Sequence, residues 1–312
     1  MPPMEPSLAV QQNLLLRYFA ATRPAFLSVT FVGVLVGLAA AAHSGVRVDA
    51  AEATLTMFFA LVAHAGANVI NDYYDARSGC DAANTDRVFP FTGGSRFIQN
   101  GVLSLRATGR FGYGLLAMVI PAGLWLTAHS APGLIWIGLA GLVVGWAYSA
   151  PPLQLQSRGL GEFGITAGWL LVVVGSDFVQ RRTFDFAPIA AGLGFALLVA
   201  NVLYINQFPD VRADAHAGKN TVVVRLGIAR ARWGYALIAM LCYAWVLAMV
   251  LLGRLPALAV TSLIAAAPSL AAMQVLRRHA GEPQALVPAI KMTIAAATLH
   301  GLLLAAALAW PA

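Results

Sequence analysis

"NVINDYYDARSGCD", residues 68 to 81, follows a long apolar run in a chain that is otherwise poor in charge. Only 11% of the 312 residues are charged and 59% are hydrophobic, and the mean hydropathy of +0.74 is typical of an integral membrane protein. Carboxylates are costly to remove from water, yet this stretch gathers acids and amides beside an apolar helix. The polar residues that need an explanation are Asn68, Asn71, Asp72, Asp75 and Asp81.

Nine apolar runs are long enough to cross a membrane, since a spanning helix takes about 20 residues. Backbone groups find no hydrogen-bond partners in lipid, so these runs should be α-helices and the fold class all-α. The predicted spans are 24–42, 53–71, 108–127, 132–149, 160–177, 188–206, 233–252, 255–275 and 288–309. The first run is too long for a cleaved signal peptide and is predicted to be a retained helix.

The breaks between the spans are too short to form a separate soluble domain. We therefore predict a single membrane domain over residues 1–312. The two longest breaks follow the second and the sixth predicted span, and both are acidic. This placement suggests two pseudo-repeat halves, with acidic motifs at 68–81 and 206–221.

The basic residues indicate the orientation of the chain in the membrane. With the N-terminus inside, most of the 20 Lys and Arg residues fall on inner segments, and only Arg47, Arg181, Arg182 and Arg254 fall outside. This bias predicts a multi-pass inner-membrane protein whose N-terminus and acidic segments are cytoplasmic. The net charge of +7 is explained by topology and by attraction for anionic head groups or substrates, and it requires no nucleic acid. Asp177 is interpreted as part of a solvated outer helix end.

The two acidic clusters have the spacing of one helix face. The first cluster runs from Asn68 to Asp75 in steps of three or four residues, so its side chains share a face if the helix continues. Asp210 and Asp214 have the same relation after the sixth span. Mg²⁺ binds carboxylate, amide and phosphate oxygens. Two such rows facing each other could therefore hold Mg²⁺ ions with a diphosphate between them.

Other interpretations of these acids stay open. A single loop acid is most often only solvated, although two clusters on one face of so apolar a chain favour a function. A transporter also places acids between helices, but it predicts ionisable groups near the middle of the membrane, whereas these lie at helix ends. Zinc is not expected, because neither cluster has Cys or His residues at ligand spacing.

Several further residues near the clusters are candidates for substrate contacts. Lys219 and the arginines of both acidic segments could contact a diphosphate. Tyr148 and Tyr204 could stabilise a carbocation with their ring faces, or they could only pack. His64, one turn before the first cluster, is either an acceptor contact or a neutral buried histidine. Cys80 is assigned no role.

Four motifs, in order along nearly the whole chain, resemble the UbiA superfamily of intramembrane prenyltransferases. Residues 71–104, NDYYDARSGCDAANTDRVFPFTGGSRFIQNGVLS, are similar to that family's Asn-Asp-x-x-Asp motif with a further Asp. The Gly-x insertion before Asp81 and the later Gly-Gly pair resemble the branch that prenylates 1,4-dihydroxy-2-naphthoate. Further matches are Asp210, Asp214, Gly218 to Thr221, Arg225 to Gly227, Tyr148 to Pro152, Gly159 to Glu162, and Arg23 with Pro24.

The resemblance implies a nine-helix bundle that binds a polyprenyl diphosphate through Mg²⁺ between its two acidic motifs. The metal ligands that it implies are Asn71, Asp72, Asp75, Asp81, Asp210 and Asp214. We expect catalytic roles for Asp72, Asp75, Asp210, Asp214, Lys219 and Tyr148. We expect substrate contacts from Asn68, Asn71, Arg87, Arg158, His64 and Asn206. Asn220, Gln154 and Gln156 stand where members of the family often have basic residues, and they remove positive charge from this region.

The predicted function is Mg²⁺-dependent transfer of a polyprenyl group to an aromatic acceptor within the bilayer. The branch resemblance implies 1,4-dihydroxy-2-naphthoate as the acceptor, and hence a step in menaquinone biosynthesis. The same donor could also serve 4-hydroxybenzoate, homogentisate, a porphyrin-type ring or a glycerol phosphate lipid. The helices themselves do not identify the acceptor.

Overall fold

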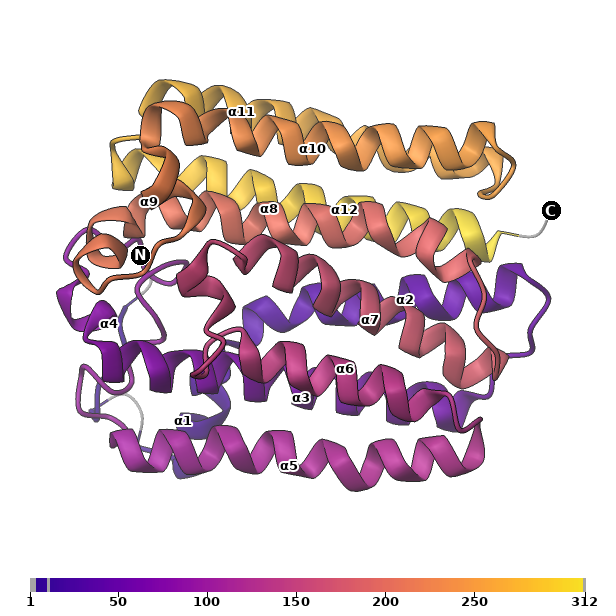
Figure 1. The fold of residues 1–312 in the computed structure, drawn as a ribbon, viewed down its shortest axis with the longest axis horizontal. Helices are drawn as coiled ribbons and strands as arrows, with labels where there is room; N and C mark the ends of the chain where they lie inside the picture. Colours follow the sequence, from indigo (N-terminus) through magenta and orange to yellow (C-terminus); the bar gives the residue numbers. More distant parts are fainter. Residues whose placement is uncertain (1–3, 10–11, 311–312) are drawn as a thin grey trace.

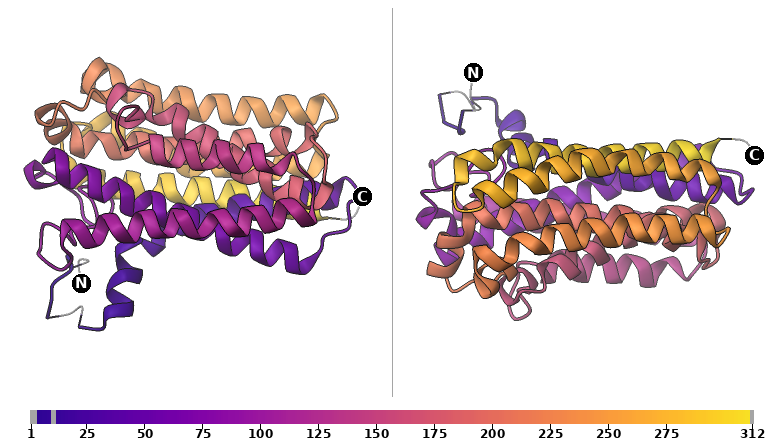
Figure 2. Two further views of the ribbon diagram at one scale, coloured as in Figure 1. Left: turned by 60° about the horizontal axis from the view of Figure 1, so that its bottom comes forward. Right: turned by 90° about the horizontal axis from the view of Figure 1, so that it is seen from above.

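The computed structural model describes residues 4–9 and 12–310, and all regular secondary structure in these ranges is helical. The long helices lie side by side along one axis and form a bundle (Figure 1). Two further views show the same alignment (Figure 2). The predicted all-α fold class is therefore confirmed.

The helices follow one another with short connections. In chain order they are α1 (Leu14–Ala21), η1 (Pro24–Phe26), α2 (Leu27–His43), α3 (Ala50–Ser78), α4 (Cys80–Ala83), α5 (Leu105–His129), α6 (Leu134–Ala147), η2 (Leu155–Arg158), α7 (Gly161–Arg181), α8 (Ala187–His216), α9 (Val222–Leu226), α10 (Ile228–Leu251), η3 (Ala257–Ala265), α11 (Ala266–His279), η4 (Pro283–Leu286) and α12 (Val287–Ala309).

Eight helices in the described part of the chain are long and apolar enough to cross a membrane. The predicted span 132–149 contains only α6, a helix of 14 residues. At about 1.5 Å per residue, α6 is about 21 Å long, which is shorter than the hydrocarbon core of about 30 Å. The predicted count of nine spans is therefore not confirmed.

Helices α3 and α8 continue into the acidic motifs, beyond the ends of the predicted spans. The second predicted span ends at 71 and the sixth at 206, but α3 reaches Ser78 and α8 reaches His216. Hydropathy falls at the first charged residue, whereas the backbone stays helical because the polar side chains share one face and bond to other elements. Gly79, with φ of 78°, ends α3 in the left-handed region that suits glycine.

Helix α8 forms the centre of the bundle. It packs against α7, α10, α12 and α2. In its most apolar 18-residue stretch, 78% of the residues are buried, which is the largest share of any span. Helices α3, α5 and α6 lie to one side, with α5 at the edge of the bundle (Figure 1). A cavity in the bundle is lined by residues from both groups of helices.

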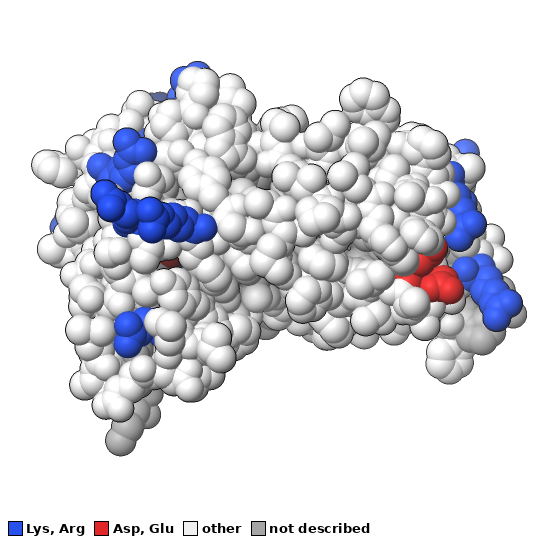
Figure 3. Space-filling view, turned by 90° about the horizontal axis from the view of Figure 1, so that it is seen from below, with Lys and Arg blue, Asp and Glu red and all other residues white. Residues whose placement is uncertain are grey.

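Charged side chains are confined to the two ends of the bundle on the face shown in Figure 3. The broad band between them carries no Lys, Arg, Asp or Glu on that face. Such a band suits a multi-pass membrane protein, because the hydrocarbon core does not solvate charge. Both acidic motifs lie at the end of the bundle that also carries α4, α9 and the N-terminus (Figure 1).

The interpretation of Asp177 as a solvated residue is wrong. Asp177 is buried near the end of α7, with 1% of its surface exposed. Its two carboxylate oxygens accept hydrogen bonds of 2.7 Å from Nε and Nη2 of Arg181, one turn later. The guanidinium also donates to Ser44 Oγ at 3.0 Å and so ties α7 to the end of α2. A partner within the same helix allows this carboxylate to be buried.

Candidate active site

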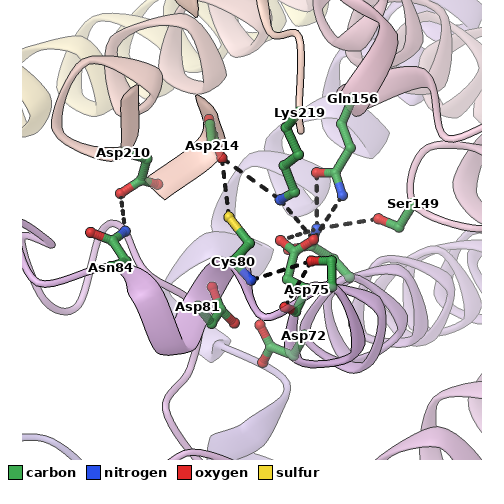
Figure 4. A network of polar contacts seen from close by, with 12 residues as sticks. Asp72, Asp75, Cys80, Asp81, Asn84, Ser149, Gln156, Asp210, Asp214 and Lys219 are labelled. Carbon is green, nitrogen blue, oxygen red and sulfur yellow. Dashed lines mark hydrogen bonds and ion pairs between the residues drawn. The ribbon is translucent and has the colours of Figure 1, made fainter. Parts of the chain in front are cut away.

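Asp75 and Lys219 form the centre of the polar cluster (Figure 4). Lys219 Nζ lies 2.7 Å from Asp75 Oδ1 and 3.8 Å from Asp214 Oδ1, so one ammonium joins the two acidic motifs. Gln156 Nε2 donates to Asp75 Oδ1 at 3.0 Å, and Asn71 Nδ2 donates to Asp75 Oδ2 at 3.1 Å. The structure therefore brings residues from α3, η2, α8 and the turn after α8 to one point.

Asp72, three residues before Asp75 in α3, faces a second cation. Its carboxylate forms an ion pair with Arg23, which lies between α1 and η1. It also accepts a hydrogen bond from the backbone N–H of Ser95 at 3.3 Å. Both Asp72 and the Arg23 head group are largely buried. The N-terminal region and the loop 84–104 thus meet at this carboxylate.

Asp81 stands on α4, the short helix that follows Gly79. Its carboxylate lies directly against the backbone of Gly94, where a Cβ atom would collide with the carboxylate oxygens. Gly94 also has φ of 75°, so both space and backbone conformation require glycine there. Arg96 Nη1 donates to the carbonyl oxygen of Asp81 at 2.5 Å. The Gly-Gly pair allows the loop to close over the acidic cluster.

The second motif supplies Asp210 and Asp214 from α8. Asn84 Nδ2 donates to Asp210 Oδ1 at 2.6 Å, and Cys80 Sγ donates to Asp214 Oδ1 at 3.3 Å. Cys80 lies within the first motif and Asn84 follows it closely, so the first motif contacts the second directly (Figure 4). Cys80, to which we assigned no role, therefore orients a carboxylate.

A cavity of about 1140 Å³ opens from this polar end into the bundle. Asn71, Asp75, Asp81, Asp210 and Asp214 line its polar end together with Lys219. Its deeper walls come from α3, α5, α6 and α7 and are mostly apolar, as with Phe59, Leu116, Ile137 and Leu171. The cavity therefore joins an ionic site to a chamber suited to a long hydrocarbon chain.

The other expected contacts on the helices also line this cavity. His64 Nδ1 lies 2.8 Å from Thr30 Oγ1, and its ring meets Trp169 edge to face at 4.9 Å. Asn68 Nδ2 donates to the carbonyl of Thr22 at 3.0 Å. Asn206 and Tyr148 line the same space. These residues lie where a substrate in the cavity would meet them.

Four candidates from the sequence are not among the residues that line the cavity: Asp72, Arg87, Arg158 and Tyr204. Asp72 is bound to Arg23 and to the backbone of Ser95 instead. Arg87 is bonded to Glu5 and to the carbonyl of Asn84, and Arg158 is bonded to the carbonyl of Pro152. Neither arginine is among the residues that line the cavity. Tyr204 packs in the core and donates its hydroxyl to the carbonyl of Ala231 at 2.7 Å. The packing alternative for Tyr204 is therefore correct.

Arg23, Gln156 and Asn84 are site residues that we did not predict from the sequence. Arg23 was counted only as a topology signal and as part of a motif, because it precedes the first span. Gln156 was noted only for a missing positive charge, but its amide bonds to Asp75 and accepts from Asn71 Nδ2 at 3.1 Å. No local pattern marks these residues, because their partners are far away in the sequence.

The oxygen atoms of this site fit Mg²⁺ on the condition that a diphosphate supplies part of its coordination shell. Within residues 4–9 and 12–310, no three His, Cys, Asp or Glu side chains converge closely enough to hold a metal ion by themselves. Mg²⁺ usually takes one or two protein carboxylates and completes its shell with water and substrate phosphate. The side-chain oxygens of Asn84 and Asn206 are buried without a hydrogen-bond partner and line the cavity. The residues thus fit ions bridged by a diphosphate and do not form a closed cage.

The electrostatics outside the spanning helices agree with a site for a cation. Burial raises the pKa of Asp81 well above its usual range, and the nearby carboxylates of Asp75 and Asp72 add to this shift. Burial opposes the charged form of Lys219, but the surrounding carboxylates outweigh this and raise the pKa of its ammonium. The acids of the cluster outnumber Arg23 and Lys219, so a divalent cation would relieve their repulsion.

Comparisons with known proteins match this fold and this cluster of motifs. The model of the UbiA prenyltransferase family matches residues 30–296. The chain is 31% identical to 1,4-dihydroxy-2-naphthoate octaprenyltransferase of Mycobacterium tuberculosis, over 94% of this chain and 97% of the relative. It is also 31% identical to the Escherichia coli protein of that name, over 92% of each chain. A UbiA homolog from Archaeoglobus fulgidus, solved with GPP and Mg²⁺ bound, has the same fold, with a TM-score of 0.60 and 17% identity over 92% of this chain and 99% of that one.

Proposed function

We infer the function from the premise that this chain belongs to the UbiA prenyltransferase family, as the resemblance in its motifs predicted. The protein is a prenyltransferase embedded in a membrane by several helices. We propose that it transfers a polyprenyl group from polyprenyl diphosphate to 1,4-dihydroxy-2-naphthoate, with Mg²⁺ as its cofactor. This reaction is a step in menaquinone biosynthesis. Relatives that carry the name of this activity align with more than nine-tenths of the chain.

One observation carries the donor side of the proposal. Asp75 and Asp214, which come from separate motifs, share Lys219 at the polar end of a long, mostly apolar cavity. A prenyl diphosphate has the same two parts, an anionic head and a hydrocarbon chain. The head would lie among the acids and their bound Mg²⁺, and the chain would occupy the apolar chamber.

The residues of the polar end would assist the departure of diphosphate. Asp75, Asp81, Asp210 and Asp214 would hold Mg²⁺, which when bound would neutralise charge on the leaving group. The allylic C–O bond breaks and its electron pair leaves with the diphosphate, while Lys219 and Arg23 add positive charge nearby. The apolar walls would keep water away from the prenyl cation until an electron-rich ring carbon of the acceptor attacks it. The ring would then lose a proton, or its carboxyl group as carbon dioxide, to become aromatic again.

The acceptor would bind deeper than the diphosphate, beside His64 and Tyr148. His64 lies against Trp169 and Thr30 on the cavity wall, a polar group among aromatic and apolar neighbours. Such a pocket suits a planar ring with hydroxyl groups. We propose that His64 contacts an acceptor hydroxyl and that the ring of Tyr148 faces the prenyl cation. The choice of the naphthoate over other rings rests on the names of the relatives.

We further propose that the acidic end faces the cytoplasm of a cell inner membrane. The basic residues of the sequence gather on the segments at this end, in agreement with the positive-inside rule. Water-soluble aromatic acceptors would then reach the polar mouth from the cytoplasm, and the prenyl donor would come from the bilayer.

A single assay tests the proposed reaction. Purified protein in detergent or nanodiscs is incubated with Mg²⁺, a labelled polyprenyl diphosphate and a panel of acceptors. The panel holds 1,4-dihydroxy-2-naphthoate, 4-hydroxybenzoate, homogentisate and a glycerol phosphate lipid. A prenylated product of 1,4-dihydroxy-2-naphthoate is expected. Transfer to another acceptor only would overturn the proposed acceptor, and no transfer to any of them would overturn the proposed reaction.

A further inference from the structure

The N-terminal segment lies across the loop that covers the acidic cluster. We refer to residues 84–104, between α4 and α5, as the cap loop. Met4, Glu5 and Pro6 form part of the cavity wall, next to cap-loop residues such as Ser95 and Phe97. Residues more than eighty positions apart in the sequence therefore share one wall of the candidate active site.

The Glu5 carboxylate binds the cap loop at both of its ends. Oε1 accepts hydrogen bonds from Arg87 and lies 2.7 Å from both Nε and Nη2 of that guanidinium. Oε2 accepts from Asn100 Nδ2 at 3.1 Å and lies 3.8 Å from Arg96 Nε. Asn100 also donates to the carbonyl of Pro6 at 3.0 Å. One carboxylate thus joins the start of the loop to its end.

Arg87 and Arg96 also donate hydrogen bonds to residues in or beside the acidic motifs. Arg87 Nη1 donates to the carbonyl of Asn84 at 2.9 Å, and the Asn84 amide donates to Asp210. Arg96 Nη1 donates to the carbonyl of Asp81 at 2.5 Å. Glu5 is therefore connected through one guanidinium to the second motif and through another to the first.

The backbone of the cap loop needs such external support. It contains no helix or strand, and Arg96 has φ of 66°, in the left-handed region that non-glycine residues rarely adopt. A conformation of this kind persists when surrounding contacts determine it. For Arg96 those contacts are Glu5 on one side and the carbonyl of Asp81 on the other.

We propose that Glu5 is a positioning residue, which clamps the cap loop and so fixes Asp81, Asn84 and Asp210 for binding of the diphosphate head. The role in donor binding rests on the proposed function, whereas the ordering of the cap loop by Glu5 is independent of it. Groups that orient metal and substrate ligands from behind typically change affinity or activity by about 10- to 100-fold when removed. Loss of Glu5 should therefore weaken donor binding and leave the chemical step nearly intact.

The test compares the full-length wild-type protein with Glu5→Ala and Glu5→Gln. Glu282→Gln serves as the matched control, because Glu282 is an exposed acid whose partner is His279. Hydrogen exchange of the metal-free proteins is measured first. Faster exchange is expected within residues 88–103 of both Glu5 variants, with no change within residues 215–221 and none in the control. Unchanged exchange in the cap loop would overturn the proposal.

Steady-state kinetics then separates positioning from mere folding. For Glu5→Ala, KM for the prenyl diphosphate should rise about tenfold, while kcat stays within about twofold. The same substitution should have a smaller effect in an Arg87→Ala background, because Arg87 carries one of the two guanidinium contacts through which Glu5 acts. Unchanged kinetics despite a loosened loop would overturn the proposal. So would a lower KM, since the carboxylate would then compete with diphosphate. A wild-type protein without any transfer activity would refute the proposed function, and the exchange data would still decide whether Glu5 orders the cap loop.

Discussion

Buried carboxylates lie at both ends of the helix bundle, but they are neutralised in different ways. At the end opposite the cavity mouth, Asp177 is paired with Arg181, four residues later in the same helix, through two hydrogen bonds. At the acidic end, Asp75 is paired with Lys219 and Gln156, which come from distant parts of the chain. Asp75 also lines the cavity, whereas Asp177 does not.

The difference shows what separates a structural carboxylate from a candidate catalytic one. Asp177 and Arg181 satisfy each other's hydrogen bonds and join two helices. Neighbouring residues also join helices: Arg182 pairs with Glu52 at 3.4 Å, and Gln180 accepts from the backbone N–H of Asp49 at 2.7 Å. The carboxylates at the cavity outnumber the cationic side chains beside them. They also lie near amide oxygens that have no hydrogen-bond partner. They are left able to bind a ligand that brings its own positive charge.

Removal of divalent cations should have the largest effect of all. We expect EDTA to abolish prenyl transfer and Mg²⁺ to restore it.

Because no three ligands converge in the described part of the chain, Mg²⁺ with inorganic pyrophosphate should raise the melting temperature more than either one alone. Thermal unfolding of wild type and Asp177→Asn checks this, and both should respond equally. A full shift with Mg²⁺ alone would indicate a preformed metal cage and contradict this account.

Isosteric loss of charge at the acidic end should be the next largest effect. Asp75→Asn should reduce kcat/KM by about 10²- to 10³-fold, because the protein loses a carboxylate that would hold the Mg²⁺ beside the leaving diphosphate. Asp210→Asn should reduce kcat/KM by a similar factor. The folded fraction, measured by size-exclusion chromatography, should stay that of the wild type. Normal turnover by Asp75→Asn would show that the metal assignment is wrong.

The same substitution at the opposite end should act on stability instead. In Asp177→Asn the Arg181 guanidinium loses its closest charged partner and keeps only Asp185 at 4.0 Å, which should cost about 2 kcal/mol of unfolding free energy. Activity of the folded protein at low temperature should stay within about twofold. Chemical unfolding followed by circular dichroism measures the first quantity, and the transfer assay measures the second. A folded Asp177→Asn protein without activity would remove the distinction between the two ends.

The smallest effect concerns the pH dependence at Glu5. Burial acts to raise the pKa of Glu5, but hydrogen bonds from Arg87 and Asn100 outweigh it, so the pKa lies below its ordinary value of 4.5. A depressed pKa stabilises the folded state above the ordinary value, and this contribution is lost as the pH falls through the folded-state pKa. The difference in melting temperature between wild type and Glu5→Gln should therefore be largest near neutral pH and vanish in acid. A difference that grows as the pH falls would have the wrong sign.

Much of the fold followed from local sequence properties. Hydropathy alone located the long helices, because a helix of sufficient length and apolarity is stable in lipid whatever its neighbours. It failed at α6, where a run of 18 predicted residues contains a helix of only 14. It also placed the ends of α3 and α8 too early, because hydropathy cannot distinguish a polar helix face from a loop.

The candidate site was predictable only in part. Helical spacing put Asn68, Asn71, Asp72 and Asp75 on one face, and motif resemblance paired them with Asp210 and Asp214. The partners of these acids were not predictable, since Arg23, Gln156 and Cys80 look like ordinary residues in their own segments. Arg87 and Arg158 were expected at the diphosphate, but in the structure they contact Glu5 and Pro152.

The sequence by itself determined that this chain is a membrane bundle with two acidic motifs, because length, apolarity and residue spacing are local properties. Tertiary structure decided which acids are free for a ligand. It put Lys219 between the two motifs, bound Asp177 to its own helix, and brought Glu5 onto the cap loop. The physical reason is that the cost of burying a carboxylate depends on the charges and dipoles within a few ångströms, and only the folded chain brings those together.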